Sequence, residues 1–353
     1  MYFEDNQSKA IYDNLCKLRD TGDLSYLIKA HEACGITSDS AYSFHVNLKK
    51  GQAKGKKLVL YGLGTMVHNF VTLEEKRKNT VGYLYFPFLG DIEWYGVYDK
   101  DETKQGKKEW KRLTQDELLA LKNEVLICVS TKNYYEEIKS ELQQAGVPED
   151  NIVQYIFPNT QCYEEKQYYD DFMEPRNESI VIDGGCYRCD TIKRFIDWNN
   201  GLGYEKIISF EPDPINYNIC RDIVEQKDLK NVELIHAGLS DSNAESSIVS
   251  NGDDTSYICQ DGNQKIKLMT IDDAVKDEHC SFIKLDVEGF ELESLKGAKE
   301  TIQNNHPRMA ISLYHKVQDL KEIPQYILEL SNDYKFYLRI YSNAYLEIVL
   351  YAV

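Results

Sequence analysis

Two short apolar segments that each end in an acidic residue constrain the fold of this chain more than any other feature. The first runs through residues 179–182 into Asp183, which Gly184 and Gly185 follow, and the second runs through residues 206–210 into Glu211. In parallel α/β sheets, an acid at a strand end binds ribose, and glycines at the first turn let the backbone approach a ligand closely. The pair predicts a site for a nucleoside cofactor.

Segments of strand and helix character alternate through the rest of this half of the chain, which predicts an α/β fold with a parallel sheet. A turn at Ser342 and Asn343 joins the last two strands, and we expect these to form an antiparallel hairpin that closes the sheet. The expected strands are 179–182, 206–210, 232–236, 281–285, 308–313, 335–341 and 345–352, with 246–249 and 264–269 as further strands or a flap; the expected helices are 190–200, 214–227, 291–304 and 319–331.

A smaller α/β unit precedes this one. Its expected strands are 57–61, 94–98, 125–129 and 152–155, and its expected helices run through residues 67–71 and 134–145. Gly62 and Gly64, with Asp99 after the next strand, resemble a truncated Rossmann dinucleotide site that lacks the third glycine. Such units resemble sugar-nucleotide or coenzyme A domains fused to sugar-modifying enzymes. A scaffold that binds no ligand explains the pattern equally well.

The length of 353 residues predicts about two domains. Ile11, Leu15 and Leu18 recur at helical spacing near the start of the chain, and a tyrosine-rich, charged stretch separates the two α/β units. We expect a helical lead-in at 1–56, a Rossmann-like α/β domain at 57–160, a linker at 161–178 and a second Rossmann-like domain at 179–353.

The charge balance and the absence of long apolar segments restrict the partners. Forty-one basic and 58 acidic side chains give a net charge of -17, so no basic excess exists to neutralise nucleic acid phosphates. The chain start lacks a basic region followed by an apolar run, and no segment reaches the ~18 apolar residues of a membrane span. We therefore expect a cytoplasmic protein that binds neither nucleic acid nor membrane.

The nine cysteines do not show the spacing of a zinc site. Cys186 and Cys189 form a Cys-x-x-Cys pair, but Cys162 and Cys220 lie far from it in the sequence. Free, buried thiols in a reducing compartment are the expected state, and no metal ligands are predicted.

Six landmarks occur in a fixed order in the second half of the chain. They are Asp183-Gly184-Gly185, Glu211-Pro212-Asp213, Ala237 to Asp241, Met269 to Asp273, Lys284-x-Asp286-x-Glu288-Gly289, and Ile311 to His315. Together they resemble the FkbM family of S-adenosylmethionine-dependent methyltransferases, from about Ser179 to the end of the chain. The resemblance implies a Rossmann-like methyltransferase sheet and S-adenosylmethionine as the cofactor.

The cofactor contacts follow from strand-end chemistry and from this resemblance. Glu211 is expected to bind the ribose hydroxyls of the cofactor. Asp183 or a neighbouring backbone carbonyl is expected to bind the ammonium at the cofactor's amino acid end. A helix is expected to start near Asp190, and its backbone N–H groups are suited to bind the carboxylate of the cofactor. Ser240 and Asp241 are expected to end the third strand, where the resemblance places the adenine edge. The full expected set is Asp183, Gly184, Gly185, Thr191, Glu211, Ser240, Asp241 and Asp286.

Transfer of a methyl group to oxygen requires an aligned acceptor and a group that removes its proton. His315 is our first choice for this base, and Asp286 is the second, as base or as the residue that orients the acceptor. Lys284 is expected to lower the pKa of a neighbouring acid. Without the resemblance, a lone histidine at a strand end is more often structural.

We therefore expect an O-methyltransferase that acts on a hydroxyl of a carbohydrate, a sugar nucleotide or a similar polar metabolite, as a monomer or a homo-oligomer. One alternative is an NAD-dependent sugar-modifying oxidoreductase that uses the first domain. The other is a non-catalytic nucleoside-binding relative. Cys189 fits that alternative, since it stands where the family usually has glycine and its sulfur is expected to weaken cofactor binding.

Overall fold

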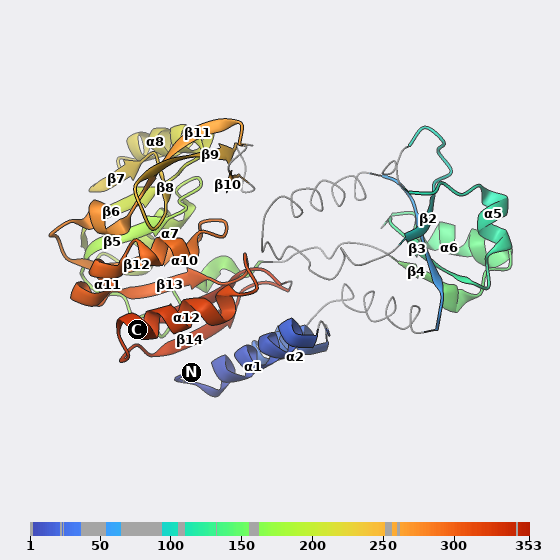
Figure 1. Ribbon diagram of the computed structural model, residues 1–353, viewed down its shortest axis with the longest axis horizontal. Coiled ribbons are helices and arrows are strands. Elements are labelled where there is room, and N and C mark those ends of the chain that lie inside the picture. Colours follow the sequence, from blue (N-terminus) through green and yellow to red (C-terminus); the bar gives the residue numbers. More distant parts are fainter. Residues whose placement is uncertain are drawn as a thin grey trace. The chain divides into compact units, whose positions relative to one another are not determined.

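A computed structural model of the protein describes residues 3–21, 23, 25–36, 54–64, 94–104, 110–131, 133–154, 162–250, 256–259, 262–343 and 345–353. The chain forms two compact units (Figure 1). Unit 1 comprises residues 1–13, 162–342 and 346–353, and unit 2 comprises residues 14–161 and 343–345.

Unit 1 contains a seven-stranded sheet in the order β14-β15-β13-β12-β5-β6-β7. Strand β15 is antiparallel to both of its neighbours, and the other pairs in the sheet are parallel. The α/β fold class with a terminal antiparallel hairpin is thus confirmed. The strands are β5 (Glu178–Gly184), β6 (Tyr204–Phe210), β7 (Val232–Ile235), β12 (Cys280–Leu285), β13 (Arg308–Ser312), β14 (Phe336–Ile340) and β15 (Ile348–Ala352).

The hairpin does not simply extend the sheet, because its second strand lies between β13 and β14. All five residues of β15 are buried, whereas burial alternates along β14. A strand that is apolar on both faces is suited to a position between two neighbours, and a strand of alternating burial is suited to an edge. The burial pattern therefore accounts for this insertion.

Helices follow the strands of unit 1 and pack beside the sheet (Figure 1). The predicted helix at 291–304 is two helices that separate at Gly297, whose carbonyl accepts the Asp272 N–H at 2.8 Å. A Cβ at Gly297 would lie 2.1 Å from the Ser240 carbonyl oxygen, so the break lets two backbones approach. The helices are α7 (Asp190–Asn199), α8 (Pro214–Gln226), α9 (Ile271–Val275), α10 (Glu291–Lys296), α11 (Lys299–Asn305) and α12 (Asp319–Leu330).

A second, four-stranded sheet of unit 1 has the order β10-β9-β11-β8. It corrects the expectation that Ser240 and Asp241 end the third strand of the main sheet. That strand, β7, ends at Ile235, and Ser240 follows β8, which pairs with β11 instead. The strands are β8 (Gly238–Leu239), β9 (Ala244–Val249), β10 (Tyr257–Cys259) and β11 (Gln264–Met269).

The start of the chain forms the predicted helices α1 (Asn6–Thr21) and α2 (Ser25–Ala33). Phe3 pairs with Phe336 of β14, and the Asp5 carboxylate contacts the Arg339 guanidinium at 2.6 Å. These contacts fix the first residues to the edge strand of unit 1. Residues 37–53 of the predicted lead-in lie outside the described ranges.

Unit 2 contains a parallel sheet in the order β2-β1-β3-β4, as the strand and helix alternation predicts. The predicted helix at 67–71 falls outside the residues that the structure describes. No helix in the described part of the chain is both long and apolar enough to cross a membrane. The elements are β1 (Lys57–Tyr61), β2 (Trp94–Tyr98), α5 (Gln115–Ala120), β3 (Val125–Val129), α6 (Tyr135–Gln144) and β4 (Ile152–Gln154).

Candidate active site

Most of the predicted site residues lie where four neighbouring parallel strands end. Strands β6, β5, β12 and β13 are adjacent in the sheet and run in the same direction. Their carboxyl ends therefore bring Asp183, Glu211, Asp286 and His315 to one edge. The chain continues from β5 to β6 on one side, while β12 pairs with β5 on the other, and such a switch in strand order is where open α/β sheets bind ligands.

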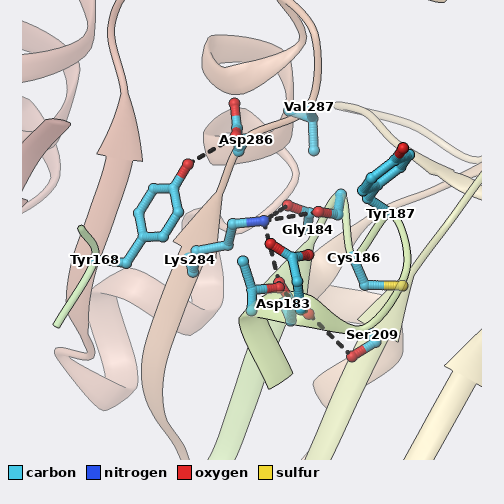
Figure 2. Close-up of polar contacts among 12 residues, drawn as sticks. Tyr168, Asp183, Gly184, Cys186, Tyr187, Ser209, Lys284, Asp286 and Val287 are labelled. Atoms are coloured by element: carbon cyan, nitrogen blue, oxygen red, sulfur yellow. Dashed lines mark hydrogen bonds and ion pairs between the residues drawn. The ribbon is translucent and has the colours of Figure 1, made fainter. Parts of the chain in front are cut away.

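Lys284 holds the turn after β5 in place (Figure 2). Its buried ammonium lies 3.2 Å from a carboxylate oxygen of Asp183 and donates to the carbonyls of Gly184 and Gly185 at 2.9 and 2.7 Å. Burial alone would lower the pKa of Lys284, but carboxylates, Asp183 first, raise it above the ordinary value. Lys284 is thus a charged structural residue whose N–H groups point at the turn.

Asp183 is engaged inside the protein. Besides Lys284, its carboxylate accepts the Thr191 hydroxyl, 3.0 Å from each oxygen, and the Ser209 hydroxyl at 3.4 Å. The side chain of Asp183 is buried. Asp183 and Thr191 therefore connect β5 to α7, and this arrangement favours the Gly185 carbonyl, rather than the carboxylate, as the partner of a ligand ammonium.

The two glycines of the turn are required by close backbone packing. Gly185 has a φ of +77°, and a Cβ there would lie 1.9 Å from the Asp286 carbonyl oxygen. A Cβ at Gly184 would lie 2.8 Å from side-chain atoms of Leu239 and of Leu285. The turn after β5 therefore packs directly on the chain that follows β12.

Glu211 lies at the end of β6 with its carboxylate fixed by the backbone. One oxygen accepts the Tyr187 N–H at 3.0 Å and the other accepts the Asp213 N–H at 2.9 Å. A carboxylate offers about four lone-pair positions, so both oxygens retain acceptor capacity. Burial raises the pKa of Glu211 to about 8, against the lowering effect of these hydrogen bonds.

The Asp286 carboxylate accepts hydrogen bonds from two tyrosines. The Tyr168 hydroxyl donates to one carboxylate oxygen at 2.7 Å (Figure 2), and the Tyr314 hydroxyl donates to the other at 3.1 Å. Burial opposes ionisation of Asp286, but His315 and Lys284 and the hydroxyl donors together lower its pKa below the ordinary value. Asp286 is therefore ionised at neutral pH.

His315 is buried among carboxylates. Its Nδ1 lies 2.8 Å from Glu291, and its Nε2 lies 3.6 Å from Asp286 and 3.7 Å from Glu288. Burial alone would lower the pKa of His315, but these carboxylates raise it to about 10. An imidazolium has no lone pair that accepts a proton, so this environment does not suit the base role expected from the sequence. It suits a fixed positive charge.

Ser240 and Asp241 follow β8, whose Leu239 side chain lies beside Gly184. The Ser240 N–H donates to the Met269 carbonyl at 3.0 Å, and Asp241 is exposed. Both residues thus follow a strand that packs at the glycine turn. Their contact with an adenine stays a prediction.

Sequence reasoning missed Tyr168, Tyr314 and Glu291 as parts of this site. Tyr168 lies in the stretch expected to be a linker, and nothing in the local sequence distinguishes it from the other tyrosines there. Glu291 carries a usable signal, because it follows Glu288 by three residues in the Asp286-x-Glu288-Gly289 motif. Its carboxylate accepts the Val287 N–H at 2.9 Å and contacts His315.

Two groups of side chains in the described part of the chain have potential metal ligands within 4.8 Å of one another. One is Asp286, Glu291 and His315, where the raised pKa of His315 favours a bound proton. The other is Cys186, Cys189 and Cys220, which are all buried. Hydrogen bonds from the other two thiols lower the pKa of Cys189 to about 5.

Unit 2 has a pocket of about 520 Å³ at the end of β1. Gly62, Gly64 and Asp99 line it, as the sequence pattern suggests, together with Lys100 and Lys104. The Asp99 carboxylate accepts the Leu63 N–H at 2.6 Å. Binding of a dinucleotide there, and hence the oxidoreductase alternative, stays a prediction.

Comparisons with known proteins identify a matching family model and a structure with a shared fold. Residues 186–336 match the family described as the methyltransferase FkbM domain. A crystal structure of a methyltransferase FkbM from Methylobacillus flagellatus KT is similar over 98% of this chain and 100% of that chain, with 16% identity and a TM-score of 0.58. At that identity, the likeness establishes the shared fold.

Other solved structures resemble about half of the chain. A putative methyltransferase from Streptococcus mutans, in complex with SAH, is 14% identical over 51% of this chain and 90% of that chain, with a TM-score of 0.33. An rRNA methylase from Streptococcus thermophilus is 16% identical over 51% of this chain and 87% of that chain, with a TM-score of 0.33. No curated protein matches the sequence.

The matched residues 186–336 cover strands β6, β7, β12 and β13 of the main sheet and the site residues Glu211, Asp286 and His315. The match to the methyltransferase FkbM domain covers less than half of the chain and agrees with the family resemblance expected from the sequence.

Proposed function

We propose that the protein is an S-adenosylmethionine-dependent O-methyltransferase whose acceptor is a hydroxyl of a carbohydrate, a sugar nucleotide or a similar polar metabolite. One observation carries the proposal. Asp286 is an ionised carboxylate that accepts the Tyr168 and Tyr314 hydroxyls, and its backbone carbonyl packs against the glycine turn that we assign to the cofactor.

The residues at the edge fit the cofactor. Glu211 presents a carboxylate whose two oxygens each accept one backbone N–H and keep room for ribose hydroxyls. The Gly185 carbonyl, oriented by Lys284, suits an ammonium, whereas the Gly184 carbonyl already accepts both Lys284 and the Asp286 N–H. Cys189 precedes α7 and its side chain forms no capping hydrogen bond with the ten-residue helix. The backbone N–H groups at the start of α7 are therefore suited to bind the cofactor carboxylate.

S-adenosylmethionine supplies a methyl group on an activated sulfonium, so the protein has to align the acceptor and manage its proton. Asp286 accepts a hydrogen bond from the acceptor hydroxyl and takes its proton. The His315 imidazolium, 3.6 Å from the same carboxylate, keeps Asp286 ionised before the reaction. Tyr168 and Tyr314 fix the plane of the carboxylate by donating to its two oxygens.

The side chains around Asp286 suit a polar methyl acceptor better than an apolar one. The acceptor side of the site contains the Asp286 and Glu288 carboxylates, about a quarter exposed, and the hydroxyls of Tyr168 and Tyr314. Buried hydrogen-bonding groups disfavour a ligand that leaves them unpaired. A molecule with several hydroxyls satisfies them, as a carbohydrate does.

Replacement of Asp286 tests this assignment. In an assay with methyl-labelled S-adenosylmethionine and a panel of monosaccharides and sugar nucleotides, Asp286→Asn should lower kcat at least about 100-fold, since general-base catalysis contributes that much or more. Affinity for S-adenosylhomocysteine should change little.

Asp228→Asn is the matched control, because Asp228 is exposed and forms an ion pair with the exposed Lys230; its kcat should equal that of the wild type. Each active acceptor is compared with the deoxy analogue that lacks one hydroxyl. Transfer that persists with every deoxy analogue, or an Asp286→Asn enzyme with unchanged kcat, contradicts the proposed chemistry.

A further inference from the structure

Three cysteine sulfurs meet beneath the glycine turn of unit 1. The sulfurs of Cys186 and Cys220 lie 3.6 Å apart, and a sulfur of each of the three cysteines lies within 4.8 Å of the other two. None of Cys186, Cys189 and Cys220 is more than 2% exposed. Figure 2 shows the Cys186 sulfur directed away from Lys284, so the group is separate from the charged residues that hold the turn.

The backbone is arranged to bring the first two sulfurs together. Residues 186–189 form a tight turn in which the Cys189 N–H donates to the Cys186 carbonyl at 2.7 Å. Tyr187 and Cys189 have φ values of 46° and 58°, a region that side chains other than glycine rarely adopt. Such strain persists only where the surroundings demand it. A turn of this kind places both sulfurs of a Cys-x-x-Cys pair on one side.

Cys220 reaches the pair from the next helix. It lies in α8, 31 residues after Cys189, and its thiol lies 2.7 Å from the Tyr187 carbonyl oxygen in the middle of the turn. The cap of α8 fixes this approach, because Asp213 accepts the Ile215 N–H at 2.7 Å. The sequence spacing gave no sign of the third cysteine, since only the fold places α8 beside the turn.

We propose that Cys186, Cys189 and Cys220 form a binding site for a thiophilic divalent cation, with Zn²⁺ as the preferred ion. A Zn–S bond of about 2.3 Å in a tetrahedron separates two sulfurs by about 3.8 Å, close to the 3.6 Å between Cys186 and Cys220. Each thiol that is still protonated gives its proton to solvent as its sulfur binds the cation. A water or another small ligand completes the tetrahedron.

The site connects the two segments that approach the nucleoside. The Cys-x-x-Cys turn directly follows Gly185, and α8 directly follows Glu211 and its neighbours. A cation on all three sulfurs therefore joins the β5–α7 turn to the middle of α8 through metal–sulfur bonds. This role is structural, and it does not depend on which cofactor or acceptor the enzyme uses.

Metal content and cobalt spectroscopy test the site on the full-length protein, purified with a reductant and without added metal. Elemental mass spectrometry should detect one equivalent of zinc per chain. After chelation, titration with Co²⁺ should give sulfur-to-cobalt charge-transfer bands and tetrahedral d–d bands that saturate at one equivalent.

Variants assign these signals to the three sulfurs. Cys189→Gly removes one ligand and also relieves the left-handed backbone at φ 58°, so the fold should persist while the affinity for Zn²⁺ falls more than about 100-fold, beyond the loss typical of outer-shell changes. Cys220→Ser should likewise keep the fold and lower the affinity for Zn²⁺ more than about 100-fold. Cys280→Ser is the control, because Cys280 is equally buried in β12 but outside the group.

Two results would overturn the proposal. In the first, the reduced wild type binds Zn²⁺ and Co²⁺ no more tightly than folded Cys189→Gly does. In the second, the protein isolated with a reductant has a Cys186–Cys220 disulfide, seen as a loss of two free thiols, and takes up no metal after reduction. Circular dichroism of each variant separates a lost ligand from a lost fold.

Discussion

At the scale of single residues, the environment of each side chain decides the role that its type alone leaves open. Histidine is the side chain whose ordinary pKa best suits a base at neutral pH, and the sequence therefore favours His315. The structure surrounds His315 with Glu291, Glu288 and Asp286, and these carboxylates make it a cation. The same contacts keep Asp286 ionised, so the candidate base shifts to the carboxylate.

This interpretation predicts how stability depends on pH. The folded pKa of His315, about 10, lies above the ordinary value of about 6.5, so its stabilising contribution is complete below about pH 6.5 and is lost as the pH rises through about 10. His315→Gln should lower the unfolding free energy by roughly 3 kcal/mol at about pH 6. The gap to the wild type should narrow steadily as the pH approaches 10.

Urea denaturation at a series of pH values measures this gap. His306→Gln provides the comparison, because His306 pairs with Asp333 on the surface, and its replacement should change stability by less than about 0.5 kcal/mol. A gap for His315→Gln that stays constant from neutral to alkaline pH would show that His315 is neutral in the folded protein.

At the scale of elements, the β5–α7 turn depends on how closely β12 approaches it. Gly185→Ala forces a Cβ to 1.9 Å from a backbone oxygen at a φ of +77°. Gly201→Ala introduces the same change at a φ of +78° with no atom within 4 Å. The pair therefore separates the cost of the backbone conformation from the cost of the collision.

We expect Gly201→Ala to cost about 1 kcal/mol, the penalty for a left-handed alanine. Gly185→Ala should cost at least about 3 kcal/mol, because overpacking adds to that penalty. Thermal or chemical unfolding of both variants gives the comparison. Equal destabilisation would mean that the chain after β12 does not press on the turn.

Much at this scale could be predicted from the sequence, and the exceptions have physical causes. Alternating strand and helix patterns located the main strands within a few residues, because period and turn residues are local properties. The insertion of β15 beside β13 and the break at Gly297 were not predicted. Both depend on contacts with distant segments, such as the approach of Gly297 to Ser240.

At the scale of the whole molecule, unit 2 builds a parallel sheet and unit 1 a mostly parallel one, and the candidate active site belongs to unit 1. The residues at strand ends could be predicted, since parallel strands bring their carboxyl ends together. Tyr168 and Cys220 could not, because they come from a predicted linker and from a helix interior. Only the three-dimensional packing places them against Asp286 and Cys186.

The central claim is that this edge binds the nucleoside of S-adenosylmethionine through Glu211. In the free protein, Glu211 has a pKa of about 8 and is protonated over most of the neutral range. Ribose hydroxyls that donate to Glu211 favour the charged carboxylate, so binding should release a proton. Affinity should then rise with pH up to about 8 and change little above it.

Isothermal titration calorimetry with S-adenosylhomocysteine, at several pH values and in buffers of different ionisation enthalpy, tests this claim most directly. The wild type should bind more tightly as the pH rises toward 8 and should release a proton. Glu211→Gln should bind at least about tenfold more weakly, the loss of one charged hydrogen bond, without that pH dependence. A folded wild-type protein that shows no binding at millimolar S-adenosylhomocysteine would contradict the account.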